Sequence, residues 1–211
     1  MLYLAQSFLK EGEYKNLKKE LLMSTEWEDG VNTATGKTKK IKKNLQLTRG
    51  ETYKKYSENI TKAIKNNSYI KNYAFPNKIF QILFSRTGVG MFYGPHVDLA
   101  FTEGGRRDLS FTIFLNDKNE YKGGELILYI PPEKRQIKLN AGDIIIYPTK
   151  YLHEVKQVTE GERMVCVGWI ESQIISDDDR EIISSLKKSL YEIENNSNCS
   201  ETTKLNLNTA I

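Results

Sequence analysis

Apolar and polar positions follow one pattern before about residue 78 and another after it. In two early stretches, over 6–22 and about 52–66, apolar residues recur at three- or four-residue spacing among charged ones. That spacing places them on one face of a helix, so each stretch predicts an amphipathic helix. The residues between them, 24–50, are polar and rich in Gly, Thr and Lys, and predict a long connection or an irregular strand.

After residue 78, short runs of β-branched and aromatic residues follow one another, separated by turn signals such as Gly123-Gly124. The runs are KIFQILFS, RDLSFTIFL, GELILYI, RQIKL, DIIIYP and RMVCVGWIE. Many short strands at roughly even spacing indicate an antiparallel sandwich or barrel, such as a double-stranded β-helix. We therefore expect a mainly β, α+β protein with a jelly-roll core over 76–175.

The two ends of the chain are expected to lie outside that core. Residues 1–75 predict a region of helices and loops that packs on the sheets. Ser176, followed by the acidic residues 177–179, is a candidate N-cap for a C-terminal helix over 176–194. Residues 195–211 are dominated by Asn, Ser and Thr, and predict a flexible tail.

The composition of the 211 residues narrows the class of protein. Two cysteines, Cys166 and Cys199, are too few for a disulfide-dense scaffold or a cysteine-rich zinc module. No apolar run is long enough to cross a bilayer, and the N-terminus lacks the basic start of a signal peptide. We therefore expect a cytoplasmic protein in a reducing compartment, with no membrane partner. The oligomeric state is not indicated.

The net charge of +4 comes mainly from one short segment. Residues 37–43 read KTKKIKK and hold five of the 31 basic residues, which leaves 26 against 27 acidic ones. A nucleic-acid-binding protein usually has a basic face that runs through the fold. The segment therefore indicates a solvated basic loop, and attraction of an acidic partner is the alternative.

Two histidines, the only ones in the chain, fall where a metal site would need them. His96 and Asp98 lie two residues apart, so on a strand both side chains would point to the same face. His153 follows Asp98 by 55 residues and ends the segment DIIIYPTKYLH. Two histidines and one carboxylate make the facial triad of non-haem Fe(II) oxygenases. The alternative is that each histidine is an ordinary core or surface residue.

Arg163 is the charged residue that fits this constellation. It follows His153 by ten residues and begins an apolar strand, where it shares a face with Val165, Val167 and Trp169. A buried arginine without a partner costs several kcal/mol, and a bound dicarboxylate would supply that partner. A structural carboxylate or a solvated strand end is the alternative.

With these residues, the sequence resembles the PKHD-type hydroxylases, in the prolyl 4-hydroxylase-like branch of the Fe(II)/2-oxoglutarate oxygenases. The resemblance covers most of residues 1–194. Its matching stretches are Trp27…Asp29-Gly30…Thr35…Lys43-Asn44, Leu83-Phe84…Arg86, His96-Val97-Asp98, Arg106…Asp108-Leu109-Ser110, Tyr121…Gly123-Gly124-Glu125-Leu126, Ala141-Gly142-Asp143, Tyr147-Pro148, Leu152-His153…Val155, Thr159…Gly161-Glu162-Arg163 and Trp169-Ile170…Ser172.

The resemblance implies a role for each site residue. His96, Asp98 and His153 would bind Fe(II), and Arg163 would bind the distal carboxylate of the co-substrate 2-oxoglutarate. O2 would be the oxidant, ascorbate is a further candidate cofactor, and succinate and CO2 would be released. Such enzymes often have a tyrosine nine residues before the first ligand, where it reaches the co-substrate. This chain has Thr87 there, which we expect on the co-substrate side.

The primary substrate stays open at this point, with a peptidyl proline or lysine as the first hypothesis. Tyr93 is a candidate for the substrate side, with core packing as its alternative, and Trp169 is expected to pack in the core. A nucleic-acid hydroxylase is disfavoured, because such relatives carry Arg-x-Asn-x-Thr-x-Arg where this chain has RMVCVGW. A small-molecule hydroxylase, or a non-catalytic module that binds a metal or a small acid, is the remaining alternative.

Overall fold

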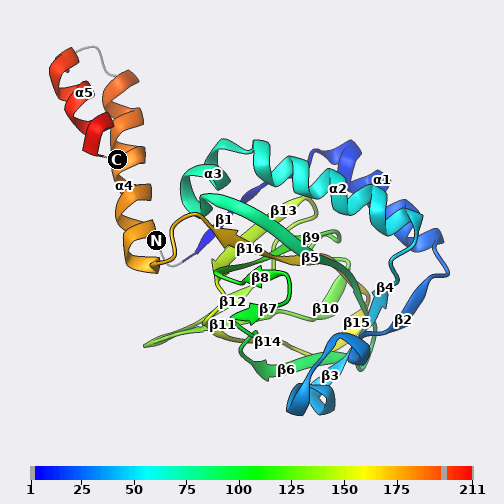
Figure 1. The fold of residues 1–211 in the computed structure, drawn as a ribbon. Helices are drawn as coiled ribbons and strands as arrows, with labels where there is room; N and C mark the ends of the chain where they lie inside the picture. Colours follow the sequence, from blue (N-terminus) through cyan, green and yellow to red (C-terminus); the bar gives the residue numbers. More distant parts are fainter. Residues whose placement is uncertain (1–2, 196–198, 211) are drawn as a thin grey trace.

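Two antiparallel β-sheets face each other in the computed structural model, which describes residues 3–195 and 199–210 (Figure 1). The larger sheet has seven strands, in the spatial order β1 (Leu4–Ser7), β13 (Asp143–Pro148), β9 (Leu109–Phe114), β16 (Arg163–Ser172), β5 (Pro76–Thr87), β4 (Leu45–Leu47) and β2 (Trp27–Asp29). The smaller sheet has five, in the order β12 (Glu133–Ile137), β11 (Leu126–Ile130), β14 (Leu152–Val155), β6 (Phe92–His96) and β3 (Lys42–Lys43). Two short pairs complete the strands: β10 (Tyr121–Gly123) with β15 (Val158–Gly161), and β7 (Phe101–Thr102) with β8 (Gly105–Arg106).

Three helices cover the outer face of the larger sheet: α1 (Glu11–Met23), α2 (Glu51–Asn66) and α3 (Ser68–Ala74) (Figure 1). Their apolar stripes, with Leu17, Leu21 and Ile64, are fully buried against Phe84 and Cys166 of the sheet. This cluster is the main core, and it fixes the larger sheet as a rigid support for whatever lies on the opposite face.

A second apolar cluster lies between the two sheets. Val165 of β16 packs there with Leu126 and Leu128 of β11, whereas Cys166 points to the helix side. The alternation along β16 is therefore the one predicted, with Arg163 on the inner face and Cys166 as a small buried apolar residue. The predicted jelly-roll fold is confirmed, and each of the six apolar runs forms or overlaps a strand.

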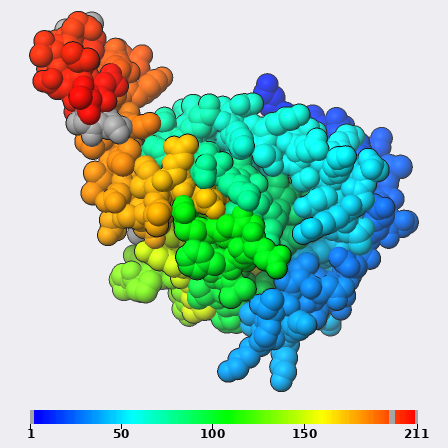
Figure 2. Space-filling view, in the orientation of Figure 1, coloured from blue at the N-terminus to red at the C-terminus, as the bar shows by residue number. Residues whose placement is uncertain are grey.

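The ends of the chain differ in part from the prediction. The first helix begins at Glu11 instead of residue 6, because Leu4–Ser7 pair with the edge strand β13. The C-terminal helix α4 (Asp177–Asn195) begins as predicted, and Ser176 Oγ accepts a bond of 3.1 Å from the Asp179 amide. Where we expected a flexible tail over 195–211, a further helix, α5 (Glu201–Ala210), packs on α4. Residues 196–198 and 211 lie outside the described residues. These two helices protrude from the sheets (Figure 2, orange and red).

The polar segment 24–50 folds into short strands and two 3₁₀ turns, Gly30–Thr33 and Gly36–Ile41. The prediction of a solvated basic loop holds for Lys37, Lys39, Lys40 and Lys43, which are exposed, and is wrong for Lys42, which is buried. Lys42 belongs to β3, which pairs with β6, and strand alternation turns its side chain inward. Among the described residues, no helix is both long and apolar enough to span a membrane.

Candidate metal centre

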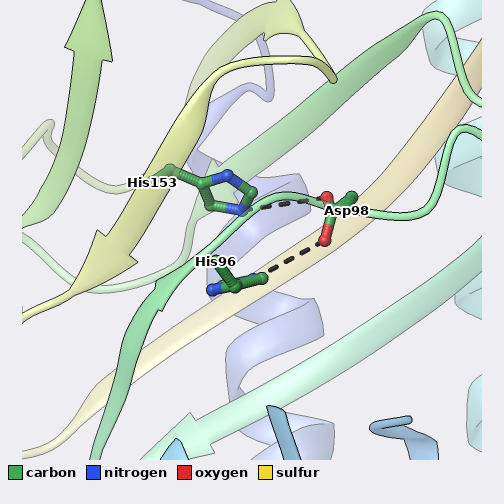
Figure 3. A group of neighbouring side chains, drawn as sticks. All are labelled: His96, Asp98 and His153. Carbon is green, nitrogen blue, oxygen red and sulfur yellow. Dashed lines mark ion pairs between the residues drawn. The ribbon is translucent and has the colours of Figure 1, made fainter. Parts of the chain in front are cut away.

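The side chains of His96, Asp98 and His153 converge between the two sheets (Figure 3). His96 ends β6 and His153 lies on β14, and the two residues are direct partners in the register of these strands. Asp98 lies in the connection that follows β6, so the expectation that it extends the strand is wrong, although its side chain does return to the same point. One potential ligand atom from each residue lies within 4.8 Å of the other two.

Backbone carbonyls orient both imidazole rings. His96 Nδ1 lies 2.8 Å from the Gly94 carbonyl oxygen, and His153 Nδ1 lies 3.0 Å from that of Tyr151. A carbonyl can only accept, so each Nδ1 carries the proton and each Nε2 keeps its lone pair. The Nε2 atoms face Asp98, at 3.6 Å from Oδ1 for His96 and 3.7 Å from Oδ2 for His153. Burial lowers the pKa of His153, which further favours the neutral, metal-binding form.

Asp98 is held by two donors on one of its two oxygens. Trp169 Nε1 donates to Oδ2 at 3.0 Å and Ser110 Oγ donates to it at 3.2 Å. Burial alone would raise the pKa of Asp98, but the polar groups around it, which include the donating indole N–H of Trp169, lower it below the usual range. The carboxylate is therefore ionised. Because both hydrogen bonds reach Oδ2, Oδ1 is the oxygen left for a metal ion.

A cavity of about 740 Å³ surrounds these residues and extends to Arg163. Arg163 is 3% exposed, and its Nε has no hydrogen-bond partner within 3–195 and 199–210. No carboxylate of the described chain forms an ion pair with its guanidinium either, so its charge is buried without the partner that arginine normally requires. Thr87 is buried beside it, as its direct partner between β5 and β16. The predicted site residues thus all line one cavity.

Other residues of this cavity were given no role from the sequence, or a different one. Tyr147 packs edge-on against His153, with ring centroids 5.5 Å apart. Tyr93 stacks on His96 at 3.7 Å, so it lies at the site. Trp169 is half-buried and bonds to Asp98 instead of serving only as core. Arg107 and Lys42 also line the cavity. Their places depend on pairing between distant strands, for which the sequence has no local signal.

Comparison with known proteins agrees with this geometry. Residues 82–171 match the family model described as the 2OG-Fe(II) oxygenase superfamily. A PKHD-type hydroxylase of Prochlorococcus marinus strain MIT 9515 is 47% identical over 188 residues, which are 88% of this chain and 85% of the relative. One from strain MIT 9312 is 49% identical over 177 residues, 83% of this chain and 79% of the relative. The chain belongs to the PKHD-type hydroxylases.

Solved structures support the fold of this hydroxylase. A prolyl-4-hydroxylase of Pseudomonas putida superposes with a TM-score of 0.61 at 19% identity, covering 82% of this chain and 94% of that one. A Trichoplax adhaerens prolyl hydroxylase, solved with a hypoxia inducible factor peptide fragment, gives 0.60 at 18% identity, covering 87% of each chain. As a member of its superfamily, this PKHD-type hydroxylase is an oxidoreductase that requires Fe(II), 2-oxoglutarate and O2.

Proposed function

We propose that His96, Asp98 and His153 bind the Fe(II) of this hydroxylase and that Arg163 binds 2-oxoglutarate. The donor set fits the metal, because two neutral imidazoles and one ionised carboxylate are the facial ligands that non-haem iron prefers. Arg163 fits the dicarboxylate, because a buried guanidinium with an unpartnered Nε needs an anion. When bound, Fe(II), 2-oxoglutarate and O2 together supply hydroxylation of a substrate C–H bond, with succinate and CO2 as products.

The chain's own residues then position and shield the reacting groups. Arg163 stabilises the distal carboxylate of the co-substrate and so fixes its orientation in the cavity. Thr87, on the neighbouring strand, places a hydroxyl on the same side, in the role that the resemblance gives to a longer tyrosine. Gly94 and Tyr151 hold the imidazole rings through their carbonyls, and Trp169 holds the carboxylate.

The primary substrate we propose is a peptidyl proline or lysine. The support is the similarity to prolyl hydroxylases, one of which was solved with a peptide fragment, and a cavity large enough for more than the co-substrate. Incubation with Fe(II), 2-oxoglutarate, O2 and a panel of prolyl peptides, lysyl peptides and free amino acids tests this. The true substrate gains the mass of one oxygen atom as succinate appears. A dependence on ascorbate stays a prediction.

The metal assignment has its own test. His153→Ala is expected to abolish Fe(II)-dependent succinate release, because one imidazole ligand is lost. Lys118→Ala, at an exposed position away from the cavity, is the control and is expected to keep the wild-type rate. Wild-type succinate release by His153→Ala would remove the triad assignment.

A further inference from the structure

The charged side chains that line the cavity are strongly unbalanced. Four are basic, Lys42, Arg49, Arg107 and Arg163, and among the described residues Asp98 is the one acidic side chain in the lining. Arg49 is exposed to solvent, and Arg163 is assigned to the co-substrate above. Lys42 and Arg107 therefore remain as cations inside the cavity with no assigned anion.

Lys42 is buried beside the metal centre. The residue is 8% exposed, and its ammonium donates to the Thr33 hydroxyl at 2.7 Å. The ammonium also lies 5.1 Å from the ring centroid of Tyr93, which itself stacks on His96. Within the part of the chain that the structure describes, Lys42 forms no ion pair with a carboxylate. A lysine is rarely buried unless it is paired. The charges of Asp98 and Asp29 act on this ammonium without forming an ion pair with it, so a counter-ion from outside the chain would stabilise it further.

Arg107 also lies beside the metal centre, in the lining of the same cavity. Its guanidinium lies 3.9 Å from the ring centroid of Trp169, the residue that donates to Asp98. It donates to the side-chain oxygen of Gln81, but its buried Nε has no partner among residues 3–195 and 199–210. Arg107 too has no ion pair within those residues. Stacking on an aromatic ring leaves the edge of a guanidinium free to bind an anion.

Both cations are thus one side chain away from a ligand of the triad. Lys42 reaches His96 through Tyr93, and Arg107 reaches Asp98 through Trp169. Asp98 is near enough to raise the pKa of both, although burial lowers each pKa overall. The lining of this part of the cavity includes residues of the segments around 35 and 100, which are neighbours in Figure 2 (blue and green).

The charges of the bound reactants do not remove this excess. Fe(II) and Arg163 together carry three positive charges, and Asp98 and 2-oxoglutarate together carry three negative ones. Lys42 and Arg107 then leave positive charge in the lining of the cavity, which an acidic group of the primary substrate would reduce. A buried charge without a partner costs several kcal/mol, so the arrangement favours a substrate with an acidic group.

We propose that the primary substrate carries a carboxylate that Lys42 and Arg107 bind while a neighbouring C–H bond faces the metal. This inference rests on the proposed function. A carboxylate suits these donors, because one of its oxygens can accept from the ammonium and the other from the free edge of the guanidinium. The carboxylate has two sources, the free end of an amino acid or peptide and an acidic side chain within a peptide.

Matched pairs of acid and amide test the proposal without turnover. The probes are N-acetylproline with N-acetylprolinamide, and blocked peptides that carry Pro-Glu or Pro-Gln. They are titrated by calorimetry, without oxygen, into protein with and without Mn(II) and 2-oxoglutarate. We expect the acid of at least one pair to bind about tenfold or more tightly than its amide, which corresponds to about 1.4 kcal/mol. The pair that discriminates identifies the source of the carboxylate.

Variants then assign the preference to the two cations. Lys42→Met and Arg107→Met are expected to abolish the preference for the acid, and Lys42→Arg to retain most of it, because the charge is kept. Lys43→Met is the matched control, since Lys43 is the exposed neighbour on the same strand. Its preference is expected to equal that of the wild type.

The proposal is overturned if acid and amide are indistinguishable in every pair, including the case in which neither binds. It is also overturned if both methionine variants keep the preference, or if a phosphoserine peptide binds more tightly than every carboxylate. Failure of the proposed function is separate, because it would appear as absent Fe(II)-dependent succinate release by the wild-type protein.

Discussion

Replacing Trp169 with phenylalanine isolates one hydrogen bond at the metal centre. The indole N–H donates to Asp98 Oδ2 at 3.0 Å, and the same ring stacks under Arg107. Phenylalanine keeps an aromatic face for the guanidinium and removes the donor together with part of the ring volume, a loss of volume that the Trp27→Phe control shares. The variant therefore leaves the triad complete but loosens the orientation of its carboxylate.

The expected effect follows from the partners that Asp98 keeps. A hydrogen bond to a charged group contributes about 1.5–3 kcal/mol. Ser110 still donates to the same oxygen at 3.2 Å, so the lower end applies. We expect Trp169→Phe to weaken metal binding about tenfold, within the range of about 10–100-fold found for residues that orient metal ligands.

Titration with Co(II), followed by its visible absorption, measures this affinity in the absence of turnover. Trp27→Phe is the matched control, because Trp27 is the only other tryptophan and its buried Nε1 has no hydrogen-bond partner among the described residues. That control is expected to bind Co(II) as the wild type does. Equal affinities of Trp169→Phe and wild type would refute the argument that the indole positions Asp98.

Three further outcomes follow from the structure. Arg163→Met should raise the 2-oxoglutarate concentration for half-maximal succinate release by about 30-fold or more, because a charge-assisted pair is lost. If that concentration were unchanged, Arg163 would not bind the co-substrate. Gly124→Ala should destabilise the fold by about 1–3 kcal/mol in urea unfolding, since φ is +66° and a Cβ would lie 3.1 Å from Arg163 Cδ. Gly12→Ala is the control and should not destabilise the fold, because a Cβ there would have nothing within 4 Å. Burial lowers the pKa of Lys42 to about 8 from 10.5, so between these pH values the folded state loses a proton that the unfolded state keeps, and stability should rise with pH. In urea titrations at several pH values, metal-free Lys42→Met should lack this rise in the free energy of unfolding. At pH 7 the variant should be more stable than the wild type. If its free energy of unfolding rose with pH as steeply as that of the wild type, Lys42 would not be the group responsible.

The predictions that succeeded relied on local patterns. Runs such as DIIIYP combine high β-propensity with turn signals, so the strands of the core could be located from the sequence. The convergence of His96, Asp98 and His153 could be anticipated because histidine is rare in this chain and the spacing of His96 and Asp98 is short. Arg163 was singled out because a charge within an apolar strand is conspicuous, and its role stays a proposal.

The elements that escaped prediction depend on long-range pairing. β1 is short and polar in part, and it exists because β13 offers it an edge. Lys42 resembles its exposed neighbours in the lysine run, and only the pairing of β3 with β6 turns it inward. Trp169 looked like an ordinary core residue because the donor it provides to Asp98 crosses 71 residues of sequence. Such contacts are set by tertiary structure, which no local window contains.

If His96 and His153 bind the metal as proposed, their direct pairing makes metal affinity a measure of strand register. A shift of β14 by one residue would turn His153 to the opposite face of the sheet. The three proposed ligands would then no longer converge, although the sequence is unchanged. An ion that binds the correct register and not the unfolded chain stabilises that register by mass action. Metal supply during refolding should therefore increase the yield of correctly paired protein. The iron required for catalysis would then also stabilise the native register of the strands.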